Sequence, residues 1–182
     1  MRKAVTAVVL LLAGTVTTIA AGLAPAGALE GCNVTWGSLP KTSSPMSTAP
    51  ITNLRAGRHA CYDRLVVDVA GTVPGYDGRY VSQVTQDGSG NPVPLRGGAF
   101  LSFVVRSPGH DASGRPTYRP ANRSEAVNVA GYRTFRQVAW TGTFEGQSGI
   151  AVGVRARVPF RVSTWQSSPT SGVVVLDVAH GW

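Results

Sequence analysis

The chain has 182 residues, and its 17 lysines and arginines outnumber its 9 aspartates and glutamates, for a formal net charge of +8. This length fits one domain with a sizeable core, and its two cysteines cannot alone supply the four ligands of a structural zinc site. Arginine provides most of the positive charge. Such a surface favours carboxylate or phosphate partners through bidentate contacts, although the same charge also serves solubility alone.

Residues 1–28 have the pattern of a secretory signal peptide. Arg2 and Lys3 form a positive start, the apolar run AVTAVVLLLAGTVTTIAAGLA follows, and the small residues at 26–28 provide a cleavage site. The apolar run is about long enough to span a bilayer, but no basic stop-transfer cluster follows it. We therefore expect cleavage after residue 28, a secreted protein that is extracellular or associated with the cell wall, and no stable membrane insertion of the mature chain.

Cys32 and Cys61 are the only cysteines, and export favours a disulfide between them. The bond closes a loop of about 30 residues, which contributes about 3.6 kcal/mol in the chain-entropy model. An alternative is lipidation of Cys32, because LEGC loosely resembles a bacterial lipobox. Glu30 is a poor residue in that motif, and lipidation leaves Cys61 without a partner. The disulfide is therefore the preferred interpretation.

Beyond the signal segment, the composition favours strands and turns and gives no convincing helix. The segment LPKTSSPMSTAP is rich in serine, threonine and proline and is expected to be a surface loop. Residues 107–133 are expected to form a second, longer loop of the kind that often carries function. Turn signals separate most of seven predicted strands, at Arg64–Ala70, Arg79–Gln86, Ala99–Arg106, Phe135–Thr141, Ile150–Arg157, Phe160–Trp165 and Val173–Ala179.

These short strands predict an all-β fold, a β-sandwich of about seven to eight strands. We divide the chain into the signal peptide at residues 1–28, an N-terminal extension at 29–56 that the disulfide ties down, and the sandwich domain at 57–182. Pro159 indicates a bulge, a turn or an edge strand just before the sixth predicted strand. Large aromatic side chains usually fill the core or its rim, and we expect this of Trp36, Trp140 and Trp165.

Two strand-like segments resemble each other, YDRLVVDVAG at residues 62–71 and GVVVLDVAHG at 172–181. In each, alternate residues make one strongly apolar face, and the aspartate, Asp68 or Asp177, lies on the other, mixed face. A carboxylate placed there can accept hydrogen bonds from backbone N–H groups or pair with an arginine. We interpret both aspartates as structural residues of two equivalent strands. The pair is disfavoured as the two acids of a glycosidase, since no sugar-stacking aromatic residue is adjacent.

Four motifs are distributed along the mature chain: GRHACYDRLVVDVAG, PGYDGRYVSQVTQDGSGNPVPLRGGAFLSFVV, FRQVAWTGTFEGQSGIAVGVRARVPFRV and VVVLDVAH. With them, residues 57–106 and 132–180 resemble the AMIN-like domain of secreted actinobacterial proteins, which is related in pattern to the AMIN (amidase N-terminal) domain; CNVTWGS at 32–38 also fits some members. The resemblance implies a β-sandwich without enzymatic activity that directs proteins to the cell envelope, at least partly by binding peptidoglycan. One departure is Ser171-Gly172, where AMIN-type strands often carry an arginine.

Signals of catalysis and metal binding are weak. The three histidines, His59, His110 and His180, lack HxH, HxxxH or HExxH spacing, so we expect surface or capping roles and no metal site. The sequence has no GxSxG nucleophile elbow, and an oxidised Cys61 is not a nucleophile. We therefore expect a protein that is not an enzyme and has no cofactor, with a small secreted hydrolase as the least favoured alternative.

Arginines close to aromatic side chains are the best candidates for binding. The candidates are Arg115, Tyr118 and Arg119 in the long loop, and Arg133 and Arg136 on either side of a phenylalanine. They are suited to stacking on sugars and pairing with muropeptide carboxylates or teichoic phosphates, but they equally fit an ordinary surface with snorkelling arginines.

The preferred function is a secreted, non-catalytic module of the cell envelope that binds peptidoglycan or another anionic wall polymer. The alternative is an interaction module that binds a secreted partner protein through a sheet edge or a loop. Nucleic acid is not an expected partner.

Overall fold

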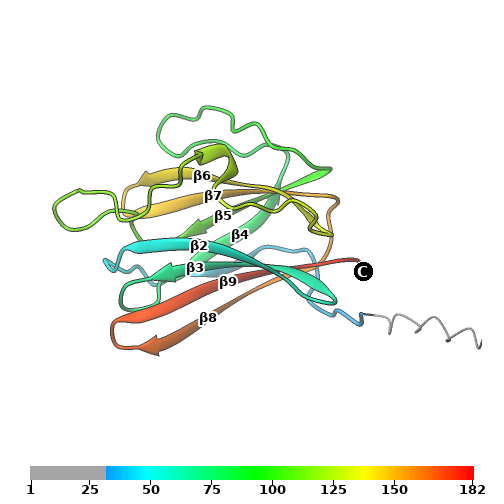
Figure 1. The fold of residues 1–182 in the computed structure, drawn as a ribbon, viewed down its shortest axis with the longest axis horizontal. Helices are drawn as coiled ribbons and strands as arrows, with labels where there is room; N and C mark the ends of the chain where they lie inside the picture. The colour runs from blue at the N-terminus through cyan, green and yellow to red at the C-terminus, as the bar shows by residue number, and fades with distance from the viewer. Residues whose placement is uncertain (1–31) are drawn as a thin grey trace, which may run out of the picture. The chain divides into compact units, whose positions relative to one another are not determined.

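The computed structural model describes residues 32–182. The expected signal peptide and its cleavage site lie outside the described residues. Two antiparallel sheets pack against one shared core (Figure 1), so the all-β sandwich predicted from sequence is confirmed. In this part of the chain, the 3-10 turn η1 at Arg123–Glu125 is the one helical element, and no helix is long and apolar enough to cross a membrane.

The first sheet has five strands in the order β1-β4-β5-β7-β6, and the second has four in the order β2-β3-β9-β8. The strands are β1 Lys41–Ser43, β2 Ile51–Arg58, β3 Tyr62–Val69, β4 Tyr76–Val81, β5 Ala99–Val105, β6 Phe135–Phe144, β7 Gln147–Val154, β8 Phe160–Ser168 and β9 Ser171–Ala179. The edges of the first sheet are therefore β1 and β6, and those of the second are β2 and β8.

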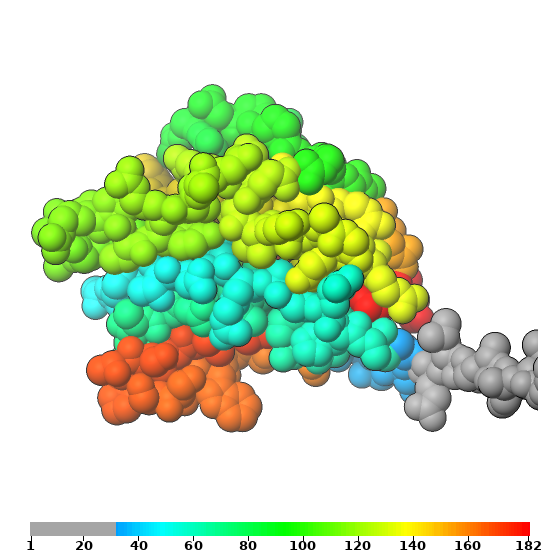
Figure 2. All heavy atoms as spheres, viewed as in Figure 1, coloured from blue at the N-terminus to red at the C-terminus, as the bar shows by residue number. Residues whose placement is uncertain are grey.

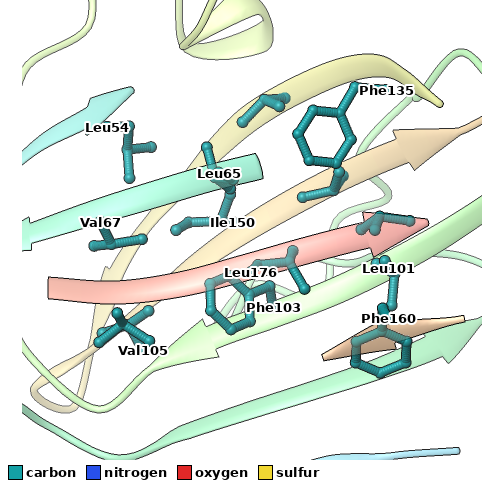
Figure 3. Close-up of a cluster of buried hydrophobic side chains, with 14 of the residues drawn as sticks. Leu54, Leu65, Val67, Leu101, Phe103, Val105, Phe135, Ile150, Phe160 and Leu176 are labelled. Carbon is teal, nitrogen blue, oxygen red and sulfur yellow. The ribbon is translucent and has the colours of Figure 1, made fainter. Parts of the chain in front are cut away.

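The core contains branched aliphatic and phenylalanine side chains from both sheets (Figure 3). Most strands contribute alternate residues, because side chains alternate between the two faces of a strand. Fully buried members are Leu65, Val67, Phe160 and Leu176 from the four-stranded sheet, and Leu101, Phe103, Val105, Phe135 and Ile150 from the five-stranded one. Burying a side chain of this size contributes about 1.5–3 kcal/mol, so this core is the main force that holds the sheets together.

The two similar segments of sequence form neighbouring strands, β3 and β9, at the centre of the four-stranded sheet. Their apolar faces are in register, with Leu65 opposite Leu176 and both side chains fully buried. On each strand the aspartate lies on the face turned away from the core, as alternation predicts. They are not cross-strand partners, because Arg64 is opposite Asp177 while Asp68 is four residues further along β3.

All seven predicted strands are present, and the largest difference in bounds is at β4. This strand begins at Tyr76 and ends at Val81, whereas the sequence predicts Arg79–Gln86. Gly78, which precedes the predicted strand, lies inside β4, and the ring of Phe160 packs against it. A Cβ atom at this position would lie 3.3 Å from that ring. The glycine therefore marks close packing within a strand rather than a turn.

Two further strands, β1 and β2, are absent from the sequence prediction. β1 lies inside the segment expected to be a surface loop, so that expectation is wrong for Lys41–Ser43. In β2 the buried residues Ile51 and Leu54 are three positions apart, because a bulge between Ile51 and Asn53 breaks the alternation. β2 also runs across the boundary that we placed at residue 56.

The expected disulfide between Cys32 and Cys61 is present, with Cα atoms 5.4 Å apart. It ties the segment before β1 to the turn between β2 and β3. The same segment also reaches β8, where the carbonyl of Gly37 accepts a hydrogen bond of 2.9 Å from the N–H of Phe160. The N-terminal segment is therefore attached to the sandwich at two points.

The long loop at residues 107–133 packs along the sandwich. The Pro108 carbonyl accepts the N–H of Ile51 at 2.7 Å, and the N–H of Ala126 donates to the Val138 carbonyl at 2.8 Å. Apolar side chains of the loop also pack on the core. The loop thus covers the start of β2 and the middle of β6.

Candidate functional site

The outer face of the four-stranded sheet is hollowed by a groove of about 690 Å³. We call it the arginine groove, because guanidinium groups from three strands line it. Alternation brings these residues to one face, since each strand contributes every second side chain. The lining residues are Arg55, Ala56, Gly57, His59, Arg64, Val66, Arg161, Ser163, Trp165, Val173 and Val175.

The buried carboxylate of Asp177 lies between two of these arginines. The register places Asp177 of β9 opposite Arg64 of β3 on one side and opposite Arg161 of β8 on the other. Arg64 donates through Nε to Oδ1 at 2.7 Å and through Nη2 to Oδ2 at 2.9 Å, and Arg161 donates through Nε to Oδ2 at 2.9 Å. The hydrogen bonding to Asp177 raises the pKa of Arg64. Two positive charges therefore share one carboxylate.

Aromatic rings support the same two arginines. The ring of Trp36 lies 4.3 Å from the guanidinium carbon of Arg161, and the ring of Tyr62 lies 5.2 Å from that of Arg64. Both are cation–π distances. The rings hold the guanidinium groups in position without neutralising their charge.

Trp165 lies at the margin of the groove and is 72% exposed, so the expectation that it fills the core or its rim is wrong. Trp140 is buried, as expected, and Trp36 is partly buried. The indole of Trp165 projects on the outer face because it alternates along β8 with Val162, which packs on the core. An exposed aromatic ring of this kind can stack on a sugar.

A second ion pair, between Arg55 of β2 and Asp68 of β3, lies on the same face. Nε of Arg55 is 3.0 Å from Oδ2 of Asp68, and Nη2 is 3.0 Å from Oδ1. The hydrogen bonding to Asp68 raises the pKa of Arg55. Because the arginine side chain is 57% exposed, water screens this pair, and it is weaker than the pairs of Asp177.

The groove carries more positive than negative charge, because three arginines face two aspartates. The two terminal amino groups of Arg161 donate to no atom within residues 32–182. Free donors on a planar guanidinium match the geometry of carboxylate and phosphate groups. Together with the valines of the floor and the exposed indole, they make the groove suited to an anionic ligand.

Replacing Asp177 with alanine is expected to lower the free energy of unfolding by about 2–3 kcal/mol. The change leaves Arg64 and Arg161 without their shared anion, although both side chains are partly exposed and regain water. The matched control is Asp68→Ala, which removes a partly exposed carboxylate with one arginine partner and is expected to cost less than about 1 kcal/mol. Urea unfolding followed by circular dichroism measures both, and equal losses would contradict a central role for Asp177.

The five binding residues predicted from sequence do not gather at one site. Tyr118 and Arg119 line a second cavity, of about 620 Å³, between the long loop and the second half of β6. Arg115 instead pairs with Asp111, at 3.0 Å from Nε to Oδ2. The exposed side chains of Arg119 and Arg133 form no hydrogen bond or ion pair within residues 32–182, so these two members of the group are free to bind.

Arg133 and Arg136 lie at the start of β6, toward the opposite end of the strand from that cavity. Arg136 donates to the backbone carbonyls of residues 132, 133 and 135. Its guanidinium therefore holds the turn that enters β6.

Tyr118 holds the long loop against the sandwich. Its ring packs edge-on against Trp140, with centroids 5.0 Å apart, and its hydroxyl donates to the carbonyl of Ala126 at 3.2 Å. Burial raises the pKa of Tyr118 to about 12. These contacts occupy the ring and the hydroxyl that were expected to bind a sugar.

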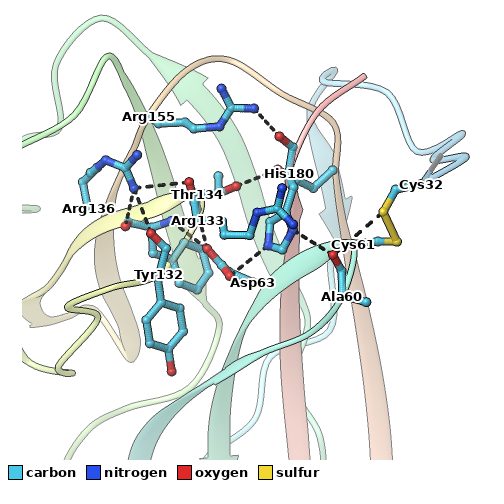
Figure 4. A network of polar contacts seen from close by, with 12 residues as sticks. Cys32, Ala60, Cys61, Asp63, Tyr132, Arg133, Thr134, Arg136, Arg155 and His180 are labelled. Atoms are coloured by element: carbon cyan, nitrogen blue, oxygen red, sulfur yellow. Dashed lines mark hydrogen bonds and ion pairs between the residues drawn. A yellow bond between two sulfur atoms is a disulfide. The ribbon is translucent and has the colours of Figure 1, made fainter. Parts of the chain in front are cut away.

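A buried carboxylate meets a histidine at the end of the sandwich near the disulfide (Figure 4). Oδ1 of Asp63 lies 3.0 Å from Nε2 of His180, and Oδ2 accepts the N–H groups of Thr134 and Phe135 at 2.6 and 3.0 Å. Nδ1 of His180 lies 3.1 Å from the carbonyl oxygen of Ala60. Both ring nitrogens are thus occupied, and neither is free to take a proton from a nucleophile as in a catalytic triad.

The arginines that contact the aspartates were not predicted from the sequence. Alternation along β3 puts Arg64 on the same face as Asp68, and this pattern could have indicated that arginine and aspartate side chains share that face. The contact of Arg64 and Arg161 with Asp177 depends instead on the strand order, in which β9 lies between β3 and β8. No local pattern of residues specifies that order.

The family model of the AMIN-like domain matches residues 49–180. The match begins two residues before β2, includes all strands except β1, and covers every residue that lines the arginine groove. No curated protein and no solved structure gives a significant match to the chain.

Proposed function

Because the chain belongs to the AMIN-like domain family, we propose that it is a non-catalytic module of the cell envelope that binds peptidoglycan or another anionic wall polymer through the arginine groove. Membership of the family indicates a cell-wall-associated module in general, and such domains are generally non-catalytic. The Cys32–Cys61 disulfide fits an extracellular or cell-wall location.

The observation that carries the proposal is the excess of guanidinium groups over carboxylates on a rigid sheet. Asp177 is shared by Arg64 and Arg161, so one positive charge and several N–H donors remain for a ligand. Muropeptide carboxylates and teichoic phosphates both have the geometry that these donors accept. Because strands rather than loops hold the arginines, little ordering is needed on binding.

Replacing Arg161 with glutamine is expected to weaken retention on purified peptidoglycan about tenfold, the loss that one charge-assisted hydrogen bond represents. Arg161 is chosen because Asp177 keeps its two hydrogen bonds to Arg64. Co-sedimentation of the purified protein with insoluble peptidoglycan, at several salt concentrations, measures the bound fraction. Sacculi with and without their anionic glycopolymers show which polymer is bound.

The matched control is Arg119→Gln, which removes the same charge from the cavity of the long loop. We expect this variant to bind as the wild type does. A loss with Arg119→Gln but not with Arg161→Gln would move the site to the loop, where the sequence first placed it. Absence of salt-sensitive retention of the wild-type protein on either kind of sacculus would refute the proposal.

A further inference from the structure

Strand β8 is an open edge of the four-stranded sheet, and β9 is its one neighbour there. Residues 163–167 are exposed, and the stretch from Val162 to Ser168 contains no charged residue, proline or glycine. An uncharged edge of this length is a template on which another strand can pair. Figure 2 shows β8 (orange) at the lower margin of the molecule.

The other three edges in the described part of the chain carry features that block such pairing. β1 has only three residues. β2 contains Arg55 and Arg58 and has a bulge near its start. β6 has two register shifts, and the long loop covers it through the hydrogen bond between Ala126 and Val138. β8 has a register shift only toward its end, between Gln166 and Ser168, so among residues 32–182 the stretch Val162–Gln166 is the edge segment that lacks protection.

The backbone of β8 directs free hydrogen-bonding groups toward this edge. The N–H of Phe160 donates to Gly37, on the side away from β9. Since these groups alternate between the two sides of a strand, the N–H and C=O groups of Val162 and Thr164 point to the same side. The N-terminal segment reaches only as far as Phe160. The groups of Val162 and Thr164 therefore have no backbone partner within residues 32–182.

The side chain of Trp165, next to Thr164, is 72% exposed. It lies on the outer face of the sheet, immediately beside the open edge. Exposed aromatic side chains are enriched where proteins contact each other. An exposed indole and unpaired backbone groups thus lie next to each other at the edge formed by β8.

We propose that two copies of the protein pair through β8, antiparallel, about a two-fold axis that passes beside Thr164. This register places Thr164 opposite Thr164 of the second copy and Val162 opposite Gln166. Gln166 continues the alternation, so the outward N–H and C=O groups of Val162, Thr164 and Gln166 then meet in hydrogen-bonded pairs, about six bonds in all. The two sheets become one continuous sheet, and the two arginine grooves lie side by side on the same face of it.

A second copy fits this edge because β8 is complementary to itself in this register. Trp165 lies opposite Ser163, and the two indoles are diagonal neighbours on one face, within reach of each other. Arg161 lies beyond the paired stretch, opposite the register shift at Gln166–Ser168 of the second copy, so the two copies of Arg161 are about 20 Å apart. Because this pairing uses the one unprotected edge segment among residues 32–182, assembly ends at a closed dimer rather than a fibre.

This inference does not depend on wall binding. Pairing of a single strand buries a small area, of the class below about 1,200 Å² that gives weak complexes. We therefore expect a concentration-dependent equilibrium with a dissociation constant on the order of 100 µM. Sedimentation equilibrium of the purified protein between about 10 µM and 1 mM, without any wall polymer, covers this range.

The test uses two charge variants at the two-fold axis, Thr164→Lys and Thr164→Glu. Each places like charges directly opposite one another, and each is expected to weaken dimerisation at least about tenfold. An equal mixture of the two is expected to form a heterodimer, which also shows that both variants are folded. The matched control, Asn53→Lys on the opposite edge of the sheet, adds the same charge and is expected to dimerise as the wild type does.

Two results would overturn the proposal. One is a wild-type protein that stays monomeric over the whole concentration range. The other is a dimer that survives Thr164→Lys unchanged, which would assign the contact to another surface.

Discussion

Replacing Asp63 with alanine is expected to lower the free energy of unfolding by about 4–5 kcal/mol. The side chain is fully buried, and it accepts the backbone N–H groups of Thr134 and Phe135 while contacting His180. Alanine leaves two buried donors without an acceptor, and each costs about 1–3 kcal/mol. The imidazole of His180 loses a partner as well. Equilibrium unfolding in urea measures the loss.

The matched control is Asp63→Asn, which is expected to cost only about 1 kcal/mol. The amide oxygen can accept the N–H groups of Thr134 and Phe135, and the amide nitrogen can donate to Nε2 of His180 while Nδ1 donates to Ala60. Comparison of the two variants separates hydrogen bonding from charge. If asparagine is as damaging as alanine, the negative charge of Asp63 is the essential property, and the hydrogen-bond explanation is wrong.

Removing the disulfide is expected to lower the free energy of unfolding by about 3.6 kcal/mol, the loop-closure value for a ring of about 30 residues. The ring contains β1 and β2, so its closure restricts a segment that forms part of both sheets. The variant is Cys32→Ser combined with Cys61→Ser. Its unfolding in urea, next to that of the oxidised and reduced wild type, measures the effect.

The reduced wild type is the control for this prediction, because it differs from the oxidised protein only in the bond itself. We expect it to match the double serine variant. Intact-mass measurement with and without reductant establishes the starting state, and two free thiols in the native protein would contradict the bond. Equal stability of the oxidised and reduced forms would mean that the hydrogen bond from Phe160 to Gly37 holds the N-terminal segment without the disulfide.

The sequence predicted a strand wherever apolar and polar residues alternate without interruption. β3 and β9 each carry an uninterrupted apolar face, and the sequence places both correctly. β2 escaped detection because its bulge puts Ile51 and Leu54 three positions apart and its exposed positions include Arg55. β1 is too short to show a period at all. The local pattern thus gives strands but not the irregularities that fit them to their neighbours.

The candidate site was much less predictable, because it depends on which strands are neighbours. Arg64 and Asp177 are 113 residues apart in the chain, yet they form the central ion pair of the groove. Trp165 looked like a core residue because a tryptophan in a strand usually is one. Alternation along β8 places the indole on the outer face, and the position of β8 at a sheet edge leaves it highly exposed there. The position of a strand in its sheet is a property of the whole topology, which the residues of β8 alone do not contain.

The ion pairs of Asp177 have a consequence for folding. β3 and β9 are near copies, and strands this similar can exchange places or pair out of register. They differ at the three positions before the shared core pattern, and at the third of these β3 has Arg64 where β9 has Val173. A shift of one residue would turn the Asp177 carboxylate into the core, and a shift of two would move it about 7 Å from its arginines. Asp177 meets both arginines only when β9 is in its native place and register. Its carboxylate therefore disfavours the misassembled sandwiches that two similar apolar strands would otherwise permit.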